Sequence, residues 1–174
     1  MWLEILASVV GGLLLANGVE WTMHKYVLHG LGKRRGTFWS FHWHEHHRNA
    51  LRHDFHDPCY QRFALGWHAQ GKEAWALIAA SLALSPLLWV APYLVITLWY
   101  CAANYYYCHR RSHEQPEWAK RKLRWHWDHH MGPNPNANWC VTKPWFDWLM
   151  GTREYSQAQP DKPQGQGLPT SAAE

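Results

Sequence analysis

With 174 residues, the chain is expected to form one domain, residues 1–155, followed by a tail. A formal net charge of +4 and two short basic clusters, residues 32–36 and 120–124, fit loops that flank a membrane better than a surface that binds nucleic acid. The four cysteines lack CxxC pairing, which argues against a disulfide framework and against a cysteine-based zinc ribbon.

Two apolar blocks indicate membrane-spanning helices. Residues 3–21 are long enough to cross a hydrocarbon core of roughly 30 Å, and they lack the basic start and cleavage site of a signal peptide. Residues 74–108 contain no charged residue and are too long for one span. Pro86 and Pro92 predict a hairpin with arms at 74–90 and 93–108, although Pro86 would also suit a kink in the first arm.

The positions of the basic residues predict how the chain is oriented. They follow the first span and the hairpin, whereas the hairpin turn has no charge and the N-terminal segment has only Glu4. The positive-inside rule therefore puts the N-terminus outside and both histidine-rich regions in the cytoplasm. The fold class expected is an all-α integral-membrane protein with three transmembrane helices, or four, and a cytosolic histidine-rich helical cap. A soluble protein with a buried helical hairpin is the alternative.

The C-terminal segment, residues 156–174, is rich in Pro, Gly and Gln. Such a composition cannot bury enough apolar surface to offset the entropy of ordering the chain. We therefore predict that this tail is disordered and carries none of the site.

Ten of the fourteen histidines fall into four clusters, which are His24 and His29; His42, His46 and His47; His109 and His113; and His126, His129 and His130. Residues three or four apart share one face of a helix, so the members of the last two clusters are expected to point the same way, as are His42 and His46. His24 and His29 are five apart and converge only if the helix ends or distorts between them; Gly30 would permit such an end.

Metal binding explains these ten histidines best, because burying so many imidazoles without partners is costly and solvated imidazoles need no helical spacing. Their number fits two metal ions with about five ligands each, and imidazole suits Fe, Zn, Cu and Ni. Glu20, Glu45 and Asp128 are candidates for holding the rings, since a ligating histidine usually donates its second N–H to an acceptor. A surface role for Glu45 is an equal alternative. The remaining histidines are assigned to surface, loop or outer positions: His44, His53, His56 and His68.

The order HX4H, HX3HH, apolar hairpin, HX3H, HX2HH resembles the fatty acid hydroxylase, sterol desaturase and carotene hydroxylase superfamily, over residues 20–152. Its members are integral-membrane, histidine-rich di-iron oxygenases. The resemblance implies that all ten histidines named above are both metal ligands and catalytic residues. The segment 134–152, NPNANWCVTKPWFDWLMGT, is similar to the closing region of fatty acid and sterol members, which often runs to a D-x-x-x-G-T ending, here Asp147, Gly151 and Thr152. HKYVLHG, residues 24–30, is similar to the first box of bacterial carotene hydroxylases.

The resemblance implies a lipid hydroxylase that uses O2 and two iron ions, which zinc may replace in purified samples. The favoured substrate is fatty-acyl, taken from the bilayer; the alternatives are hydroxylation of a carotenoid ring and desaturation of a lipid or sterol. No cytochrome-b5-like segment is fused to the chain, so electrons would come from a separate ferredoxin or cytochrome-b5-like protein with its reductase. The alternative outside the enzymes is a membrane protein that binds metal and catalyses no reaction. The spacing gives neither the pairing of each histidine with one metal nor the oligomeric state.

Overall fold

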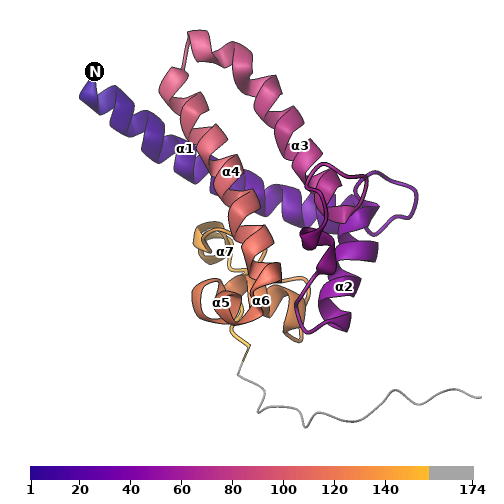
Figure 1. Cartoon of the computed structure of the whole chain (residues 1–174). Coiled ribbons are helices and arrows are strands. Elements are labelled where there is room, and N and C mark those ends of the chain that lie inside the picture. The colour runs from indigo at the N-terminus through magenta and orange to yellow at the C-terminus, as the bar shows by residue number, and fades with distance from the viewer. Residues whose placement is uncertain (157–174) are drawn as a thin grey trace, which may run out of the picture.

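The structure is a computed structural model that describes residues 1–156, and every regular element in that range is a helix (Figure 1). The predicted all-α class is thus confirmed for the described part of the chain. Of the predicted tail, only Ser156 is described. Its hydroxyl donates to Asp128, and the other residues of the tail lie outside the described range.

The N-terminal helix is long and continuous. The α-helix α1, Trp2–Thr22, runs directly into a π-helical segment, η1, Met23–Leu31. Together these 30 residues form a helix that is long and apolar enough to cross a membrane, and few of its residues are buried inside the protein. No other helix among residues 1–156 meets the same criterion of length and composition.

The second apolar block folds as a helical hairpin (Figure 1). Its arms are α3, Ala69–Leu84, and α4, Pro92–Glu114, and a short 3-10 helix, η4, Ser85–Trp89, lies between them. Pro86 falls inside η4 and Pro92 opens α4, where the missing N–H of proline costs no hydrogen bond. The hairpin is therefore as predicted, whereas its insertion in a membrane remains a prediction.

Helix α1 crosses α4 and packs directly on it (Figure 1), and a glycine lies at the contact. A Cβ atom added at Gly12 would lie 2.8 Å from the methyl group of Thr97, closer than two carbon atoms can approach. Gly11, its neighbour, has nothing within 4 Å of such an atom. Of these two adjacent glycines, Gly12 is the one that α4 approaches closely.

Short helices gather where α1 and α4 converge, below the open end of the hairpin (Figure 1). They are η2, His42–His46; α2, His47–Arg52; η3, Pro58–Gln61; α5, Pro116–Lys122; α6, Arg124–Met131; and α7, Trp145–Leu149. An apolar cluster of Trp21, Trp139 and Cys140, with Phe146 against it, joins the end of α1 to the C-terminal segment. This cap contains all ten clustered histidines or borders them.

Candidate metal centre

All ten clustered histidines are buried, each no more than 5% exposed. The four histidines assigned to outer positions behave differently. His53 is exposed, and the rings of His44, His56 and His68 are partly exposed. His68 caps the start of α3, where its Nδ1 accepts from the N–H of Gly71. The ten histidines selected by their spacing are therefore buried, and the four assigned to outer positions are not.

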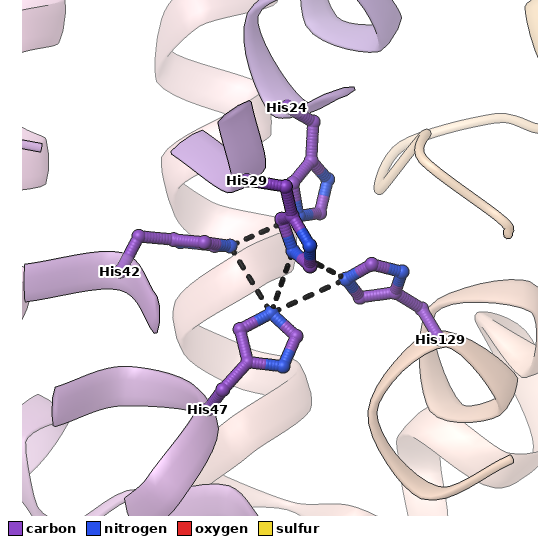
Figure 2. Close-up of side chains that lie close together, drawn as sticks. All are labelled: His24, His29, His42, His47 and His129. Atoms are coloured by element: carbon purple, nitrogen blue, oxygen red, sulfur yellow. Dashed lines mark hydrogen bonds between the residues drawn. The ribbon is translucent and has the colours of Figure 1, made fainter. Parts of the chain in front are cut away.

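Five of the buried rings point at one another in what we call the five-histidine cluster: His24, His29, His42, His47 and His129 (Figure 2). Their Nε2 atoms converge. The Nε2 of His24 lies 3.0 Å from that of His42, and the Nε2 of His29 lies 2.9 Å from that of His47. His129 approaches from α6, with its Nε2 3.2 Å from that of His29. Ligands from three separate segments thus meet at one point.

Four further rings form a second group, the four-histidine cluster: His46, His109, His113 and His130. One nitrogen from each lies within 4.8 Å of the others. The Nε2 of His126 is 3.1 Å from the Nε2 of His113, so His126 borders this cluster without being close to all its members. The structure therefore brings nine of the ten predicted ligands into two groups and puts the tenth beside the second.

Two π-helical turns explain the five-histidine cluster. In η1 the N–H of Gly32 bonds to the carbonyl of Val27, and at the end of η2 the N–H of His47 bonds to the carbonyl of His42. Each bond spans five residues, so residues five apart stack over one another. This is the distortion that His24 and His29 require, and it occurs without a helix end at Gly30.

The adjacent histidine pairs divide between the clusters. His47 and His129 belong to the five-histidine cluster, whereas their neighbours His46 and His130 belong to the four-histidine cluster. His42 and His46, which were predicted to share a helix face, have ring centroids 5.1 Å apart but belong to different clusters. Because η2 is π-helical, His42 aligns with His47 instead. The ring centroids of His47 and His130 are 4.2 Å apart, so the clusters lie side by side.

Backbone carbonyls and carboxylates fix the orientation of five rings. The Nδ1–H groups of His24, His113 and His129 donate to the carbonyls of Trp139, Phe55 and Ala137, at 2.5, 2.7 and 2.7 Å. Those of His46 and His109 donate to the carboxylates of Asp57 and Glu73, at 2.9 and 2.5 Å. With the proton on Nδ1, Nε2 carries a lone pair, which is the form that binds a metal.

The two carboxylates that hold rings, Asp57 and Glu73, were missed by the sequence interpretation. Asp57 also accepts from Asn49 and from the N–H of Cys59, and Glu73 also accepts from the hydroxyl of Tyr60. A signal existed for both. An aspartate directly before Pro58 is typical of a helix start, and Glu73 is the last acid before the apolar block, where a charge tends to be functional.

The three carboxylates proposed for that task bond elsewhere. Glu20 accepts from the backbone N–H groups of Val141 and Thr142, and Glu45 pairs with Lys72 at 3.4 Å near the surface. Asp128 pairs with two arginines of the cap, Arg124 and Arg153. Among residues 1–156, none of these acids forms a hydrogen bond or an ion pair with a histidine ring. Proximity in sequence misled because each carboxylate has other partners in the folded chain.

The D-x-x-x-G-T ending holds the loop whose carbonyl orients the ring of His24. Asp147 is fully buried and accepts from the N–H groups of Trp139 and Cys140, at 2.8 and 2.9 Å, and from the hydroxyl of Thr152. Gly151 has a φ of +65°, which suits glycine and turns the chain back towards Asp147. The ending therefore fixes the loop whose carbonyl at Trp139 accepts from His24.

Burial keeps several of the clustered rings neutral. It lowers the pKa of His129 to about 4, despite the hydrogen bond to Ala137, and lowers the pKa values of His42, His47 and His130 well below 6.5. For Asp57, burial alone would raise the pKa, but the hydrogen bonds from His46, Cys59 and Asn49 bring it to about 2. Neutral rings beside a charged carboxylate are ready for a cation at pH 7.

The donor set fits two metal ions. Imidazole nitrogens bind such ions at about 2.0–2.1 Å, so adjacent ligand atoms lie about 3.0–3.4 Å apart, close to the Nε2 separations in Figure 2. Several buried ring nitrogens have no hydrogen-bond partner in the described part of the chain, among them Nε2 of His46, Nε2 of His109 and both nitrogens of His130. Each would cost about 1–3 kcal/mol unless something bound it.

The comparisons with known proteins add no assignment to this geometry. Searches against protein-family models, curated proteins and solved structures found no match. The site is therefore described by its own chemistry: two adjacent, buried histidine clusters that could hold metal ions, next to a helix able to span a membrane.

Proposed function

We propose that this protein is a membrane-bound di-iron oxygenase that hydroxylates an unactivated C–H bond of a lipid. The observation that carries the proposal is the pair of adjacent histidine clusters, with His46–His47 and His129–His130 each contributing one ring to either cluster. Two metal ions held so close together suit a reaction that moves two electrons at one place. The resemblance of the histidine order to the lipid hydroxylase superfamily supports the same chemistry.

A membrane setting supports a lipid substrate. In the proposed topology α1, α3 and α4 enter the bilayer from the cap. Trp89 and Val90, at the tip of the hairpin, are 92% and 78% exposed, which would be costly in water. The hairpin has no charged residue between 74 and 108, and basic residues lie at the cap end. The substrate would then reach the clusters from the cytosolic leaflet.

The proposed reaction converts R–H, O2, two electrons and two protons into R–OH and water. Iron ions in the two clusters would activate O2 and insert one of its atoms into the C–H bond. The chain's own part is to hold five of the ten rings in fixed tautomers, through Asp57, Glu73 and three carbonyls, and to exclude water from the site. A separate ferredoxin or cytochrome-b5-like protein would deliver the electrons.

The direct test is oxygen incorporation. Protein loaded with Fe²⁺ without air, reduced, and exposed to ¹⁸O2 with cell lipids should yield an alcohol that carries one ¹⁸O atom, detected by mass spectrometry. The variant His130→Ala should lose the product, and the exposed control His53→Ala should keep it. Labelled alcohol found only when β-carotene is supplied would favour the carotenoid alternative. Bound iron with no oxidised product from any lipid would contradict an oxygenase and favour a metal-binding protein.

A further inference from the structure

A buried tyrosine lies against the four-histidine cluster. Tyr60, in η3, is only 1% exposed. Its ring lies parallel to that of His113 within 7°, with the two centroids 5.6 Å apart. The rings of His46 and His109 meet it edge to face, at centroid distances of 5.9 and 5.6 Å. The phenol ring therefore packs on three of the four imidazoles that would hold one of the metal ions.

The hydroxyl group of Tyr60 has a proton acceptor beside it. It donates to one carboxylate oxygen of Glu73 at 2.7 Å, while the other oxygen of that carboxylate accepts from Nδ1–H of His109 at 2.5 Å. The phenol oxygen also lies 3.0 Å from Nδ1 of His109. One buried carboxylate thus links the phenol directly to a predicted metal ligand.

Holding the ring of His109 does not require the phenol, because Glu73 reaches Nδ1 of that ring directly. A phenylalanine at position 60 would pack on the same three imidazoles. What tyrosine adds is a hydroxyl group, which can release a proton and an electron together. This property matters only next to a centre that takes up electrons, and the four-histidine cluster is such a centre in the proposed function.

Trp139 is the corresponding aromatic residue at the five-histidine cluster, and it lacks a proton acceptor. Its ring centroid is 4.9 Å from that of His29 and 5.5 Å from that of His129, but its Nε1 has no hydrogen-bond partner among residues 1–156. Loss of an electron from Trp139 would leave a positive charge in a buried place, which is costly. At Tyr60 the proton can move to Glu73, so both groups end uncharged. The surroundings therefore favour oxidation of the tyrosine.

We propose that Tyr60 is a redox site, which loses one electron to the oxidised metal centre when O2 is activated in the absence of a lipid. The proposal rests on the proposed function, in which O2 is the oxidant. In this step the O–H bond of Tyr60 breaks, its proton forms a new O–H bond on the carboxylate of Glu73, and its electron reduces an iron ion by one unit. One electron from the external donor, with the proton of Glu73, restores the phenol.

The role of such a site is to protect the cluster. A centre that has activated O2 without a substrate oxidises whatever lies next to it, and the nearest groups are its own imidazoles. An electron from Tyr60 would remove that oxidising power at a side chain which can be restored. The ring is shielded from water, which keeps the resulting neutral tyrosyl radical from side reactions.

The test detects the radical itself. Protein loaded with Fe²⁺ without air is mixed with O2 without added lipid, frozen and measured by electron paramagnetic resonance, with the iron content of each sample determined in parallel. The parent should give an organic-radical signal whose hyperfine pattern changes with ring-deuterated tyrosine and not with ring-deuterated tryptophan. Tyr60→Phe should lose the signal, and Tyr107→Phe, at an exposed position of α4, should keep it.

A second measurement tests protection. After the same exposure to O2, mass spectrometry of peptides should find more oxidised histidine at His109 and His113 in Tyr60→Phe than in the parent. Equal oxidation in the two proteins would overturn the protective role.

Tyr105 is the nearest competitor, since its ring centroid is 5.5 Å from that of His109. A radical that is lost in Tyr105→Phe and kept in Tyr60→Phe would overturn the assignment. If Tyr60→Phe binds no iron, Tyr105→Phe carries the test: a tyrosyl signal that persists in this variant supports Tyr60, and one that disappears overturns it. A parent that gives no tyrosyl signal overturns the proposal without any variant.

The outcomes also distinguish this proposal from the proposed function. A radical at Tyr60, with no alcohol formed from any lipid, would leave the redox site standing and remove the oxygenase. Alcohol that carries ¹⁸O, formed by a parent protein that never shows a tyrosyl radical, would leave the oxygenase standing and overturn the redox role of Tyr60.

Discussion

Asp57 illustrates how much the candidate metal centre depends on residues that would not touch the metal. Its carboxylate is fully buried and accepts from three donors: Nδ1 of His46, the side-chain amide of Asn49 and the N–H of Cys59. The bond to His46 fixes the tautomer of that ring and leaves Nε2 to the four-histidine cluster. The same residue also holds the loop before η3.

We expect Asp57→Asn to lower the affinity for one of two metal ions by about 10–100-fold, because the amide neither carries the charge nor fixes the tautomer. Asp54→Asn is the matched control, since Asp54 is exposed in the same loop and asparagine tolerates its φ of +50°. Competition with a chelator measures both variants. Equal affinities in Asp57→Asn and Asp54→Asn would show that Asp57 does not support the ring.

The lowered pKa values predict how the metal-free protein responds to acid. An unfolded histidine takes up a proton near pH 6.5, whereas folded His129 does so only near pH 4 and the rings of His42, His47 and His130 lower than 6.5 as well. Below pH 6.5 the unfolded state therefore binds more protons. The free energy of unfolding should fall by about 1.4 kcal/mol per pH unit for each such ring.

Thermal melting of the metal-free protein in detergent at pH 7.5, 6.5 and 5.5 checks this predicted pH dependence of stability. The melting temperature should change little between the first two values and drop clearly at the third. Asp57, with a pKa of about 2, adds a loss of stability in the same direction only below pH 3.8. A melting temperature that holds steady or rises between pH 6.5 and 5.5 would contradict neutral, buried rings.

Helical spacing predicted which histidines are buried together but not how they are grouped into two clusters. Residues three to five apart on short helices marked all ten buried histidines. The grouping depends on the π-helical turns at residues 23–31 and 42–46, and on how α6 is rotated against α2, which no local pattern reports. The partners Asp57 and Glu73 were missed because they come from loops and helix starts that only the tertiary structure brings to the rings.

At the scale of helices, the contact between α1 and α4 positions His24 relative to His109. Gly12 allows this contact, and Gly11 faces open space. Gly12→Val should therefore lower the melting temperature and weaken metal binding, since the helices must separate. Gly11→Val should weaken neither, because a side chain there meets open space and valine is no poorer a helix former than glycine. Melting curves of the two variants, measured side by side, test this prediction. Equal decreases in melting temperature would contradict close packing at Gly12.

The topology is the first prediction for the whole molecule. With three spans and the N-terminus outside, the cap and the C-terminus are cytoplasmic. A fluorescent protein that matures only in the cytoplasm should be bright when fused after residue 174 and dark when fused before residue 1. The control is a fusion after residue 90, at the hairpin tip, which should be dark as well. A bright fusion at the tip would show that the hairpin does not cross the bilayer.

The sequence was informative about the whole molecule where one physical requirement dominates. Residues 74–108 had to form a hairpin, because an uncharged apolar block of that length with central prolines has few alternatives. The sequence was less informative about the closing segment. There the carboxylate of Asp147 accepts hydrogen bonds from the backbone N–H groups of Trp139 and Cys140 and so holds their loop in place. Such bonds leave no periodic pattern.

The central claim is that each chain holds two metal ions side by side. Metal analysis of protein loaded with Fe²⁺ without air and purified in detergent tests it most directly. We predict two irons per chain in the parent, one in a double variant of the four-histidine cluster, His46→Ala with His113→Ala, and two in His53→Ala. One iron or none per chain in the parent, under the same loading, would contradict the claim.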